Sequence, residues 1–197
     1  VVFLIITILA HFVLGVFNSK PQQIVFSLCL ALLAADTSFL LAPAFRNHFW
    51  MCKIISAVQH YFWLASFLLM GAYAVVVSAI FILKINQHSS HAFSSRCLKL
   101  VTCVCWGIPV MIIIACALAD HFTKSFTYGW DRKIDVSKTC WIQPRGALVY
   151  SMTIPLSFVM IVNISCFITI LFVIVKSYQL LQTGTARESN RPIIISI

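Results

Sequence analysis

The sequence has 197 residues, of which 61% are hydrophobic and 10% are charged. Soluble domains are about 45–50% apolar and about 25% charged, and disordered chains are more polar still, so this composition excludes both classes. The net charge of +9 does not by itself indicate a partner. The composition predicts an all-α membrane protein.

Apolar segments with almost no charged residues follow one another along the chain. About 20 apolar residues let a helix cross a hydrocarbon core of about 30 Å, and no alternating pattern typical of barrel strands is present. We therefore expect helices at about 1–17, 22–43, 52–83, 98–119, 147–176 and 192–197, the first of marginal length and the last only begun. This predicts a partial seven-transmembrane bundle over residues 1–197, with five spans, the start of a sixth, and material missing at both ends.

The connecting segments indicate the orientation in the membrane. A count of Lys and Arg gives seven on each side, so the total does not decide it. The connection at 84–99 is the clearest positive loop, with Lys84, Arg96, Lys99 and no acidic residue. Short positive loops remain in the cytoplasm, which places the start of the chain outside. We expect a multi-pass protein of the plasma membrane, in which this loop contacts anionic lipid, an acidic partner or only solvent.

Two of the eight cysteines differ from the others. Cys52 and Cys140 lie in polar loops or at their edges, and the order of the helices puts both on one side of the membrane. A disulfide between them would join the third helix to the long loop at 120–145, and it requires the oxidising, extracellular side. The remaining cysteines lie in or beside apolar segments and are expected to be small buried hydrophobic residues.

A few polar and proline residues lie inside the expected spans. Asp36 is the only acidic residue there, and an unpaired buried charge is costly. It lies at about the same depth as His60, so we predict that these two pair; a backbone carbonyl, a hydroxyl or water is the alternative partner. Asn163 is expected to hydrogen-bond between helices, and Pro109 and Pro155 to break or kink theirs.

The third expected helix carries an aromatic face. His60, Trp63, Phe67 and Gly71 recur at helical spacing on one side of it. Such a face most often packs against other helices, although its outer part borders the long loop, where a cavity would open.

Residues that would support catalysis are missing from the sequence. It has no glycine-rich phosphate loop, no Ser/His/Asp or Cys/His set at the membrane surface, and no second intramembrane acid for a carboxylate pair. We expect a protein that is not an enzyme, with no metal, no cofactor and no nucleic acid partner.

Several motifs, in order, resemble those of adhesion G-protein-coupled receptors. They are Ala35-Asp36 with Phe39-Leu40, His60-Tyr61-Phe62 with Leu64-Ala65 and Phe67, Trp106-Gly107-Ile108-Pro109, Cys140-Trp141, and Pro155 with Val162-Asn163. They cover residues from about 15 to 175. The related secretin-type peptide receptors resemble the segment at 62–67 less well.

The resemblance implies a seven-helix receptor whose extracellular N-terminus follows a self-cleaving domain. In that family a tethered peptide agonist enters the bundle, and heterotrimeric G proteins bind the cytoplasmic face. It implies that Cys52 and Cys140 form the disulfide and that Phe62, Phe67 and Trp141 contact the agonist. We add Trp63 of the aromatic face to this candidate pocket, and Lys84 and Lys176 border the G-protein site.

Three positions depart from the family pattern. Val25 stands where the family often has His, Tyr73 where it usually has Glu, and Leu69 where it has Trp. The first two belong to one polar network on the cytoplasmic side. The leading hypothesis is a divergent adhesion-type receptor that relays an extracellular contact or a tethered-agonist signal. Alternatives are a cell-contact membrane anchor without signalling, a secretin-type peptide-hormone receptor and, less favoured, a transporter or channel subunit.

Overall fold

The computed structural model describes residues 1–15, 20–85, 95–123, 128, 140–142 and 145–189. Its elements are α1 (Val2–Val13), α2 (Lys20–Phe45), α3 (Phe49–Ile85), α4 (Ser95–Thr123), the short α5 (Arg145–Leu148), the π-helix η2 (Val149–Thr153) and α6 (Ile154–Ser189). The only β-structure in these segments is an isolated bridge between Tyr128 and Ile142. The described part of the chain is therefore helical, as expected, and the apolar segment at 192–197 lies outside it.

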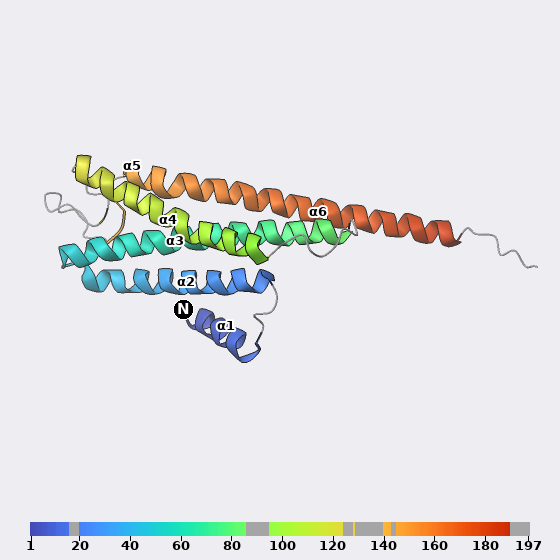
Figure 1. Ribbon diagram of the computed structural model, residues 1–197, viewed down its shortest axis with the longest axis horizontal. Helices are drawn as coiled ribbons and strands as arrows, with labels where there is room; N and C mark the ends of the chain where they lie inside the picture. The colour runs from blue at the N-terminus through green and yellow to red at the C-terminus, as the bar shows by residue number, and fades with distance from the viewer. Residues whose placement is uncertain (16–19, 86–94, 124–127, 129–139, 143–144, 190–197) are drawn as a thin grey trace, which may run out of the picture.

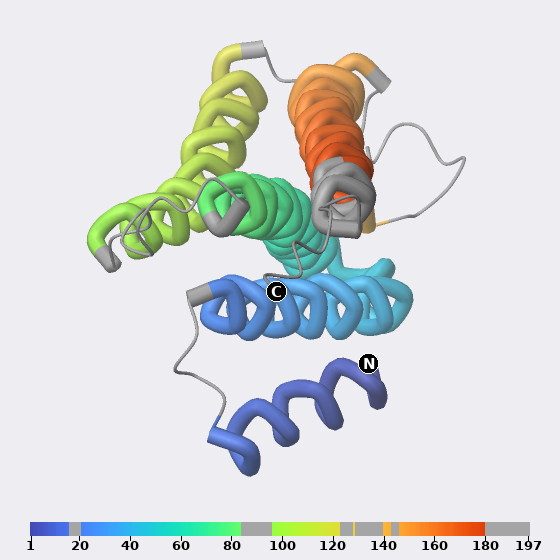
Figure 2. Tube along the Cα trace, turned by 90° about the vertical axis from the view of Figure 1, so that its right-hand side faces the viewer, coloured from blue at the N-terminus to red at the C-terminus, as the bar shows by residue number. Residues whose placement is uncertain are grey.

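Helix α3 is the central element of the bundle. It contacts α2, α4 and α6, while α1 packs against α2. Figure 1 shows consecutive helices running in opposite directions, and Figure 2, turned by 90°, shows α2 on one side of α3 and α4 and α6 on the other. The bundle end where α3 begins and α4 finishes lies at the left of Figure 1. It carries the disulfide between Cys52 and Cys140, and we call it the disulfide end.

Four of the described helices are long and apolar enough to cross a membrane. The spans are Pro21–Phe45, Phe49–Leu83, Arg96–Phe122 and Gly146–Gln179. The expected first span is only the 12-residue helix α1, which at about 1.5 Å per residue is shorter than the roughly 30 Å hydrocarbon core. Of the five expected spans, four are therefore present as full spans in the described residues, and the first is represented there by α1.

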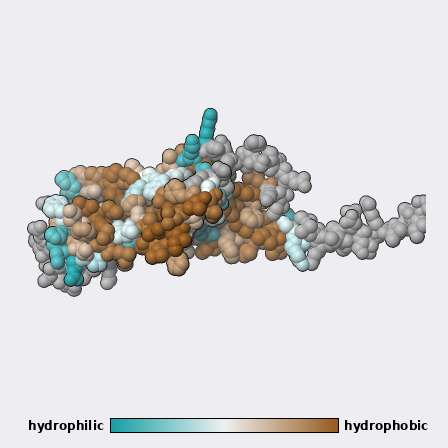
Figure 3. Space-filling view, turned by 90° about the horizontal axis from the view of Figure 1, so that it is seen from below, coloured by the Kyte–Doolittle hydropathy of each residue, from teal (hydrophilic) through white to brown (hydrophobic). Residues whose placement is uncertain are grey.

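Most large apolar side chains lie on the outside of the bundle. Figure 3 shows hydrophobic residues over much of the visible face, with hydrophilic residues at one end and in smaller groups elsewhere. Phe158, Phe167 and Phe172 of α6, for example, are all more than half exposed. Such a surface is unfavourable in water and favourable in lipid, so the exposed side chains are consistent with membrane insertion.

Small residues allow the helices to pack closely. A core of Ile24, Ala31, Leu69, Val76, Leu98 and Cys105 joins α2, α3 and α4 toward the end away from the disulfide. Gly71 of α3 faces α6, and a Cβ atom at this position would lie only 3.1 Å from Cγ1 of Val159. Close approach at small residues is the usual way in which helices associate in lipid.

The helix ends and irregular turns follow from glycine and proline. Helix α1 finishes before Gly15, whose φ of 58° is a conformation that glycine adopts at little cost. Helix α4 continues through Pro109, so this proline does not break it. The irregular backbone instead lies in η2, which ends two residues before Pro155.

Candidate functional site

A disulfide joins α3 to the chain segment that precedes α5. Cys52 in the first turn of α3 is bonded to Cys140, 88 residues later, with 4.9 Å between their Cα atoms. Both cysteines are buried. The predicted pairing is confirmed, and it holds the segment 140–142 against the bundle.

The same loop inserts a tyrosine into the helices. Tyr128 forms the β-bridge with Ile142, and its side chain is only 2% exposed. Its hydroxyl oxygen lies 2.9 Å from Nδ1 of His60 on α3. Burial raises the pKa of Tyr128, so the phenol remains protonated and can donate a hydrogen bond.

His60 connects the loop to a third element. Its Nε2 lies 3.1 Å from the backbone carbonyl oxygen of Ser151 in η2. A carbonyl oxygen only accepts hydrogen bonds, so Nε2 carries the proton, and in the neutral ring Nδ1 accepts from the hydroxyl of Tyr128. One side chain on α3 thereby joins the loop to the irregular turn before α6.

The proline that follows explains why this carbonyl needs a donor. In a regular α-helix the carbonyl of Ser151 would accept a hydrogen bond from the amide of residue 155, but Pro155 has no N–H. His60 supplies the missing donor. Neighbouring helices commonly satisfy carbonyls freed by proline in this way.

The predicted pair between Asp36 and His60 is wrong. Both ring nitrogens of His60 are bonded to Tyr128 and Ser151. The prediction matched the depth of the two residues in the membrane, but it could not specify that His60 faces the loop and η2.

A salt bridge adds a second link at the disulfide end. Nζ of Lys53 lies 3.3 Å from Oδ2 of Asp120 near the end of α4, and the side chain of Asp120 is only 7% exposed. The first four turns of α3 are thus joined to the loop by Cys52, to α4 by Lys53 and to η2 by His60.

The aromatic residues of α3 form two separate groups. The hydroxyl of Tyr61 donates to the carbonyl of Trp106 at 3.3 Å, and the ring of Phe62 packs edge-on against Trp106 with centroids 6.4 Å apart. Trp63 stacks on Phe67, one turn further along α3, with centroids 5.8 Å apart. Tyr61 and Phe62 thus contact α4, whereas Trp63 and Phe67 of the predicted aromatic face contact each other within α3.

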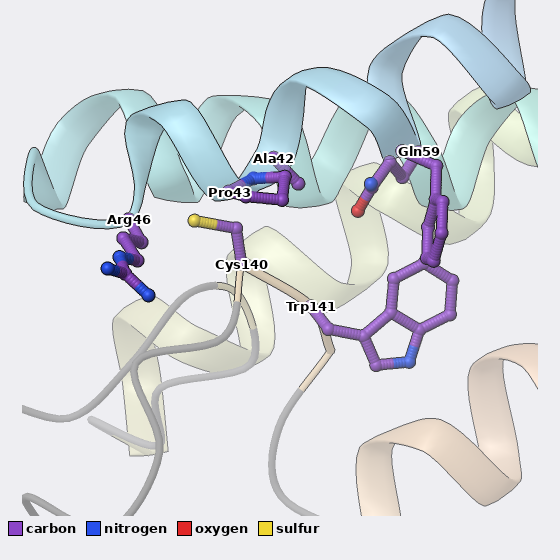
Figure 4. Close-up of a pocket in the computed structure, with 7 residues that line it drawn as sticks. Ala42, Pro43, Arg46, Gln59, Cys140 and Trp141 are labelled. Carbon is purple, nitrogen blue, oxygen red and sulfur yellow. The ribbon is translucent and has the colours of Figure 1, made fainter.

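A pocket opens at the disulfide end. Its volume is about 560 Å³, and its lining is Phe39, Ala42, Pro43, Arg46, Gln59, Cys140 and Trp141. Figure 4 shows these residues coming from the end of α2, from α3 and from the disulfide-bonded segment. Of the four predicted agonist-pocket residues, Trp141 lines this pocket, whereas Phe62, Trp63 and Phe67 are not among its lining residues.

Sequence reasoning missed Gln59. Its side chain is fully buried, and neither Nε2 nor Oε1 has a hydrogen-bond partner among the residues that the structure describes. The available signal was a polar amide within an otherwise apolar span, next to His60.

The other predicted residues lie farther from this end. Lys84 lies near the end of α3, and Lys176 is exposed on α6, both toward the end opposite the disulfide. Asn163 is half-buried on α6. Their assigned roles remain predictions.

Apolar helices and a loop bonded by a disulfide to the central helix define a multi-pass helical membrane protein. The profile of the family described as 7 transmembrane receptor (Secretin family) matches residues 1–196. The chain therefore belongs to the secretin family of seven-transmembrane receptors. This is a family of receptors rather than enzymes, in agreement with the sequence analysis.

Distant relatives over most of the chain are adhesion receptors. Identity is 26% to Adhesion G protein-coupled receptor E2 of Macaca mulatta over 83% of this chain, and 23% to Adhesion G protein-coupled receptor B2 of Mus musculus over 88%. It is 26% to Adhesion G-protein coupled receptor G2 of Rattus norvegicus over 86% of this chain. The chain spans only 18%, 10% and 17% of these relatives, respectively. The resemblance to adhesion receptors is thereby confirmed.

Proposed function

We propose that this chain is the membrane part of an adhesion-type G-protein-coupled receptor. It lies in the plasma membrane with the disulfide end outside, and it relays an extracellular contact or a tethered peptide to heterotrimeric G proteins. The orientation is supported by the disulfide, which requires an oxidising compartment, and by the positive connection between α3 and α4.

The observation that carries the proposal is the connection through His60. A ligand in the pocket contacts Trp141, which belongs to the segment that also contains Ile142, the bridge partner of Tyr128. Movement of this segment acts on His60 through Tyr128 and on the carbonyl of Ser151 through His60.

The irregular turn η2 is suited to receive such a signal. π-Turns often lie at functional sites because their hydrogen bonding can switch locally. A shift here moves α6 relative to α3 and changes the spacing of their far ends, where Lys84 and Lys176 lie. The G protein would bind at that end.

A second candidate is a cell-contact membrane anchor that does not signal. It is favoured by the apolar packing of the end opposite the disulfide, where Leu69 is fully buried and Tyr73 packs against the same core. Apolar packing of this kind suits a static bundle, whereas a polar network would suit a switch.

Nucleotide exchange separates the two candidates. Membranes from cells that express the complete protein are mixed with purified Gs, Gi, Gq and G12 heterotrimers, and loading with GTPγS is measured against membranes without the protein. The receptor proposal predicts faster loading of at least one heterotrimer. Loading at the background rate with all four, by protein shown to be at the cell surface, supports the anchor.

A further inference from the structure

One side of α4 carries two basic residues followed by a continuous apolar face. Arg96 and Lys99 lie in the first two turns of α4, and both side chains are exposed. At 3.6 residues per turn the same side of the helix continues through five further exposed residues, Leu100, Cys103, Gly107, Met111 and Ile114. The opposite side, with Leu98 and Cys105, is buried in the core. The helix thus presents one outward face that changes from basic to apolar.

Acidic side chains lie away from this basic end in the part of the chain that the structure describes. Asp120 lies near the other end of α4, where it pairs with Lys53. Asp36 lies in the second half of α2, toward the disulfide end. Arg96 and Lys99 therefore give the first turns of α4 a local positive charge.

The further helices of a seven-transmembrane receptor are expected to pack elsewhere. They follow α6 in the chain, and consecutive helices usually lie side by side. Helix α2 contacts α4 as well as α3, so the side of α3 that is left for them lies between α2 and α6. In Figure 2 the first turns of α4 lie at the left edge of the bundle, away from α6. We therefore expect the outward face of α4 to meet lipid in the complete protein.

The chemistry of the face favours a phospholipid over a protein. An anionic lipid places its phosphate beside Arg96 and Lys99 and its acyl chains along the apolar residues, so one molecule matches both parts. A soluble acidic partner would match only the basic part. A second copy of the chain has the same orientation in the membrane, so a symmetric contact through this face would bring like charges together.

Gly107 leaves room for an acyl chain on this face. No heavy atom lies within 4 Å of the position that a Cβ atom would take there. Glycine inside a helix is less favourable than alanine, and close helix packing does not explain it here as it does for Gly71, where a Cβ atom would lie 3.1 Å from Val159. An acyl chain against the uncovered backbone would account for the glycine.

We propose that the outward face of α4 binds an anionic phospholipid of the inner leaflet. Arg96 and Lys99 hold the headgroup phosphate, the guanidinium through two oxygens and the ammonium as a point charge, and an acyl chain lies over Gly107. The inference rests on the proposed function for the orientation, which puts this end of α4 at the cytoplasmic leaflet, where anionic lipids are abundant.

Photoreactive lipids locate the binding site. The complete protein is reconstituted in phosphatidylcholine nanodiscs that contain a trace of phosphatidylserine with a diazirine in its acyl chain, and crosslinked peptides are identified by mass spectrometry. We expect adducts within residues 100–111, with a yield about fivefold lower in Arg96→Gln and in Lys99→Gln, the effect of losing one cation at a membrane surface. No adduct on α4, unchanged yields in both variants, or equal labelling by a phosphatidylcholine probe would overturn the proposal.

Lys176→Gln is the matched control. It also removes an exposed cation from the end opposite the disulfide, but from α6. We expect the adduct yield on α4 to stay unchanged. An equal fall in yield would show that the lipid responds only to the total charge of this end, and the proposal would fail.

Gly107→Leu tests the path of the acyl chain with both cations in place. The new side chain fills the open space beside the backbone, so the adduct yield within residues 100–111 should fall about fourfold, the effect of losing the contact of one methylene group. An unchanged yield would contradict the assigned position of the acyl chain over Gly107.

Failure of this inference differs from failure of the proposed function. The nanodisc holds the probe in both leaflets, so the crosslinking result depends neither on the orientation in the cell nor on G proteins. A charge-dependent adduct on α4 without nucleotide exchange would refute G-protein signalling and leave the lipid site standing. Exchange without such an adduct would refute the lipid site alone.

Discussion

The hydroxyl of Tyr128 lies 2.9 Å from Nδ1 of His60, across 68 residues of sequence. This hydrogen bond joins the disulfide-bonded loop to the central helix of the bundle. The other nitrogen of the same ring satisfies a carbonyl that Pro155 leaves without its helical donor. The side chain of His60 therefore bonds both to the loop and to the irregular turn before α6.

Replacing Tyr128 by Phe tests the first of these bonds. The variant keeps the buried ring but leaves Nδ1 of His60 without its donor, so the free energy of unfolding should fall by about 1–3 kcal/mol. Thermal unfolding of the complete protein in detergent measures the change. Tyr150→Phe, at an exposed position of η2, is the control and should change stability little. Equal melting temperatures for wild type and Tyr128→Phe would refute the bond.

The contact between His60 and Ser151 predicts a specific rescue. His60→Leu leaves the carbonyl of Ser151 buried without a donor and should destabilise the protein by about 1–3 kcal/mol. Pro155→Ala restores a backbone N–H that can reach this carbonyl. The penalty of His60→Leu should therefore be smaller in the Pro155→Ala background, as a double-mutant cycle on unfolding free energies would show. Strictly additive effects would mean that His60 does not substitute for the missing amide.

Loss of the disulfide should affect folding of the protein and its transport to the cell surface. Cys140→Ser is expected to destabilise the protein by about 2–5 kcal/mol, since the bond closes a long loop. Cys52→Ser should have the same effect, and the double variant should be no worse than either single one. Surface biotinylation measures delivery, and non-reducing electrophoresis shows the bond. A mobility shift on reduction that persists in Cys140→Ser would contradict the pairing.

The close approach of α3 and α6 predicts a steric effect at Gly71. A Cβ atom there would lie 3.1 Å from Val159, so Gly71→Ala should lower the unfolding free energy by about 1 kcal/mol or more. Val159→Ala in the same protein should recover part of this loss. Gly107→Ala is the control, since nothing lies within 4 Å of its added methyl group and alanine favours a helix. Equal stability of the two glycine variants would show that the contact is not tight.

Patterns that depend on composition and order could be predicted from the sequence. Long apolar segments gave the helices, because a span needs only length and hydrophobicity. Cys52 and Cys140 could be paired because they alone lie in or beside polar loops on one side. For the first segment, of marginal length, hydropathy alone did not show that the helix finishes before Gly15.

The partners of His60 could not be predicted. They depend on how a loop residue, Tyr128, folds back between helices and on which carbonyl Pro155 leaves open, and neither follows from depth in the membrane. Phe62 and Phe67 were assigned to a pocket by resemblance, and Trp63 from its place on the aromatic face. The ring of Phe62 contacts Trp106, and Trp63 and Phe67 contact each other. Gln59 could not be singled out from the sequence, because a neutral amide within a span lacks the charge that marks Asp36.

We expect the connection from the loop through His60 to control signalling. Its most direct test is GTPγS loading by the complete protein, by Tyr128→Phe and by Tyr150→Phe, each normalised to the amount at the cell surface. We expect loading by wild type and Tyr150→Phe, and a rate changed by about tenfold in Tyr128→Phe, the effect of losing one buried hydrogen bond. Equal loading by all three proteins, or no loading by any of them, would contradict it.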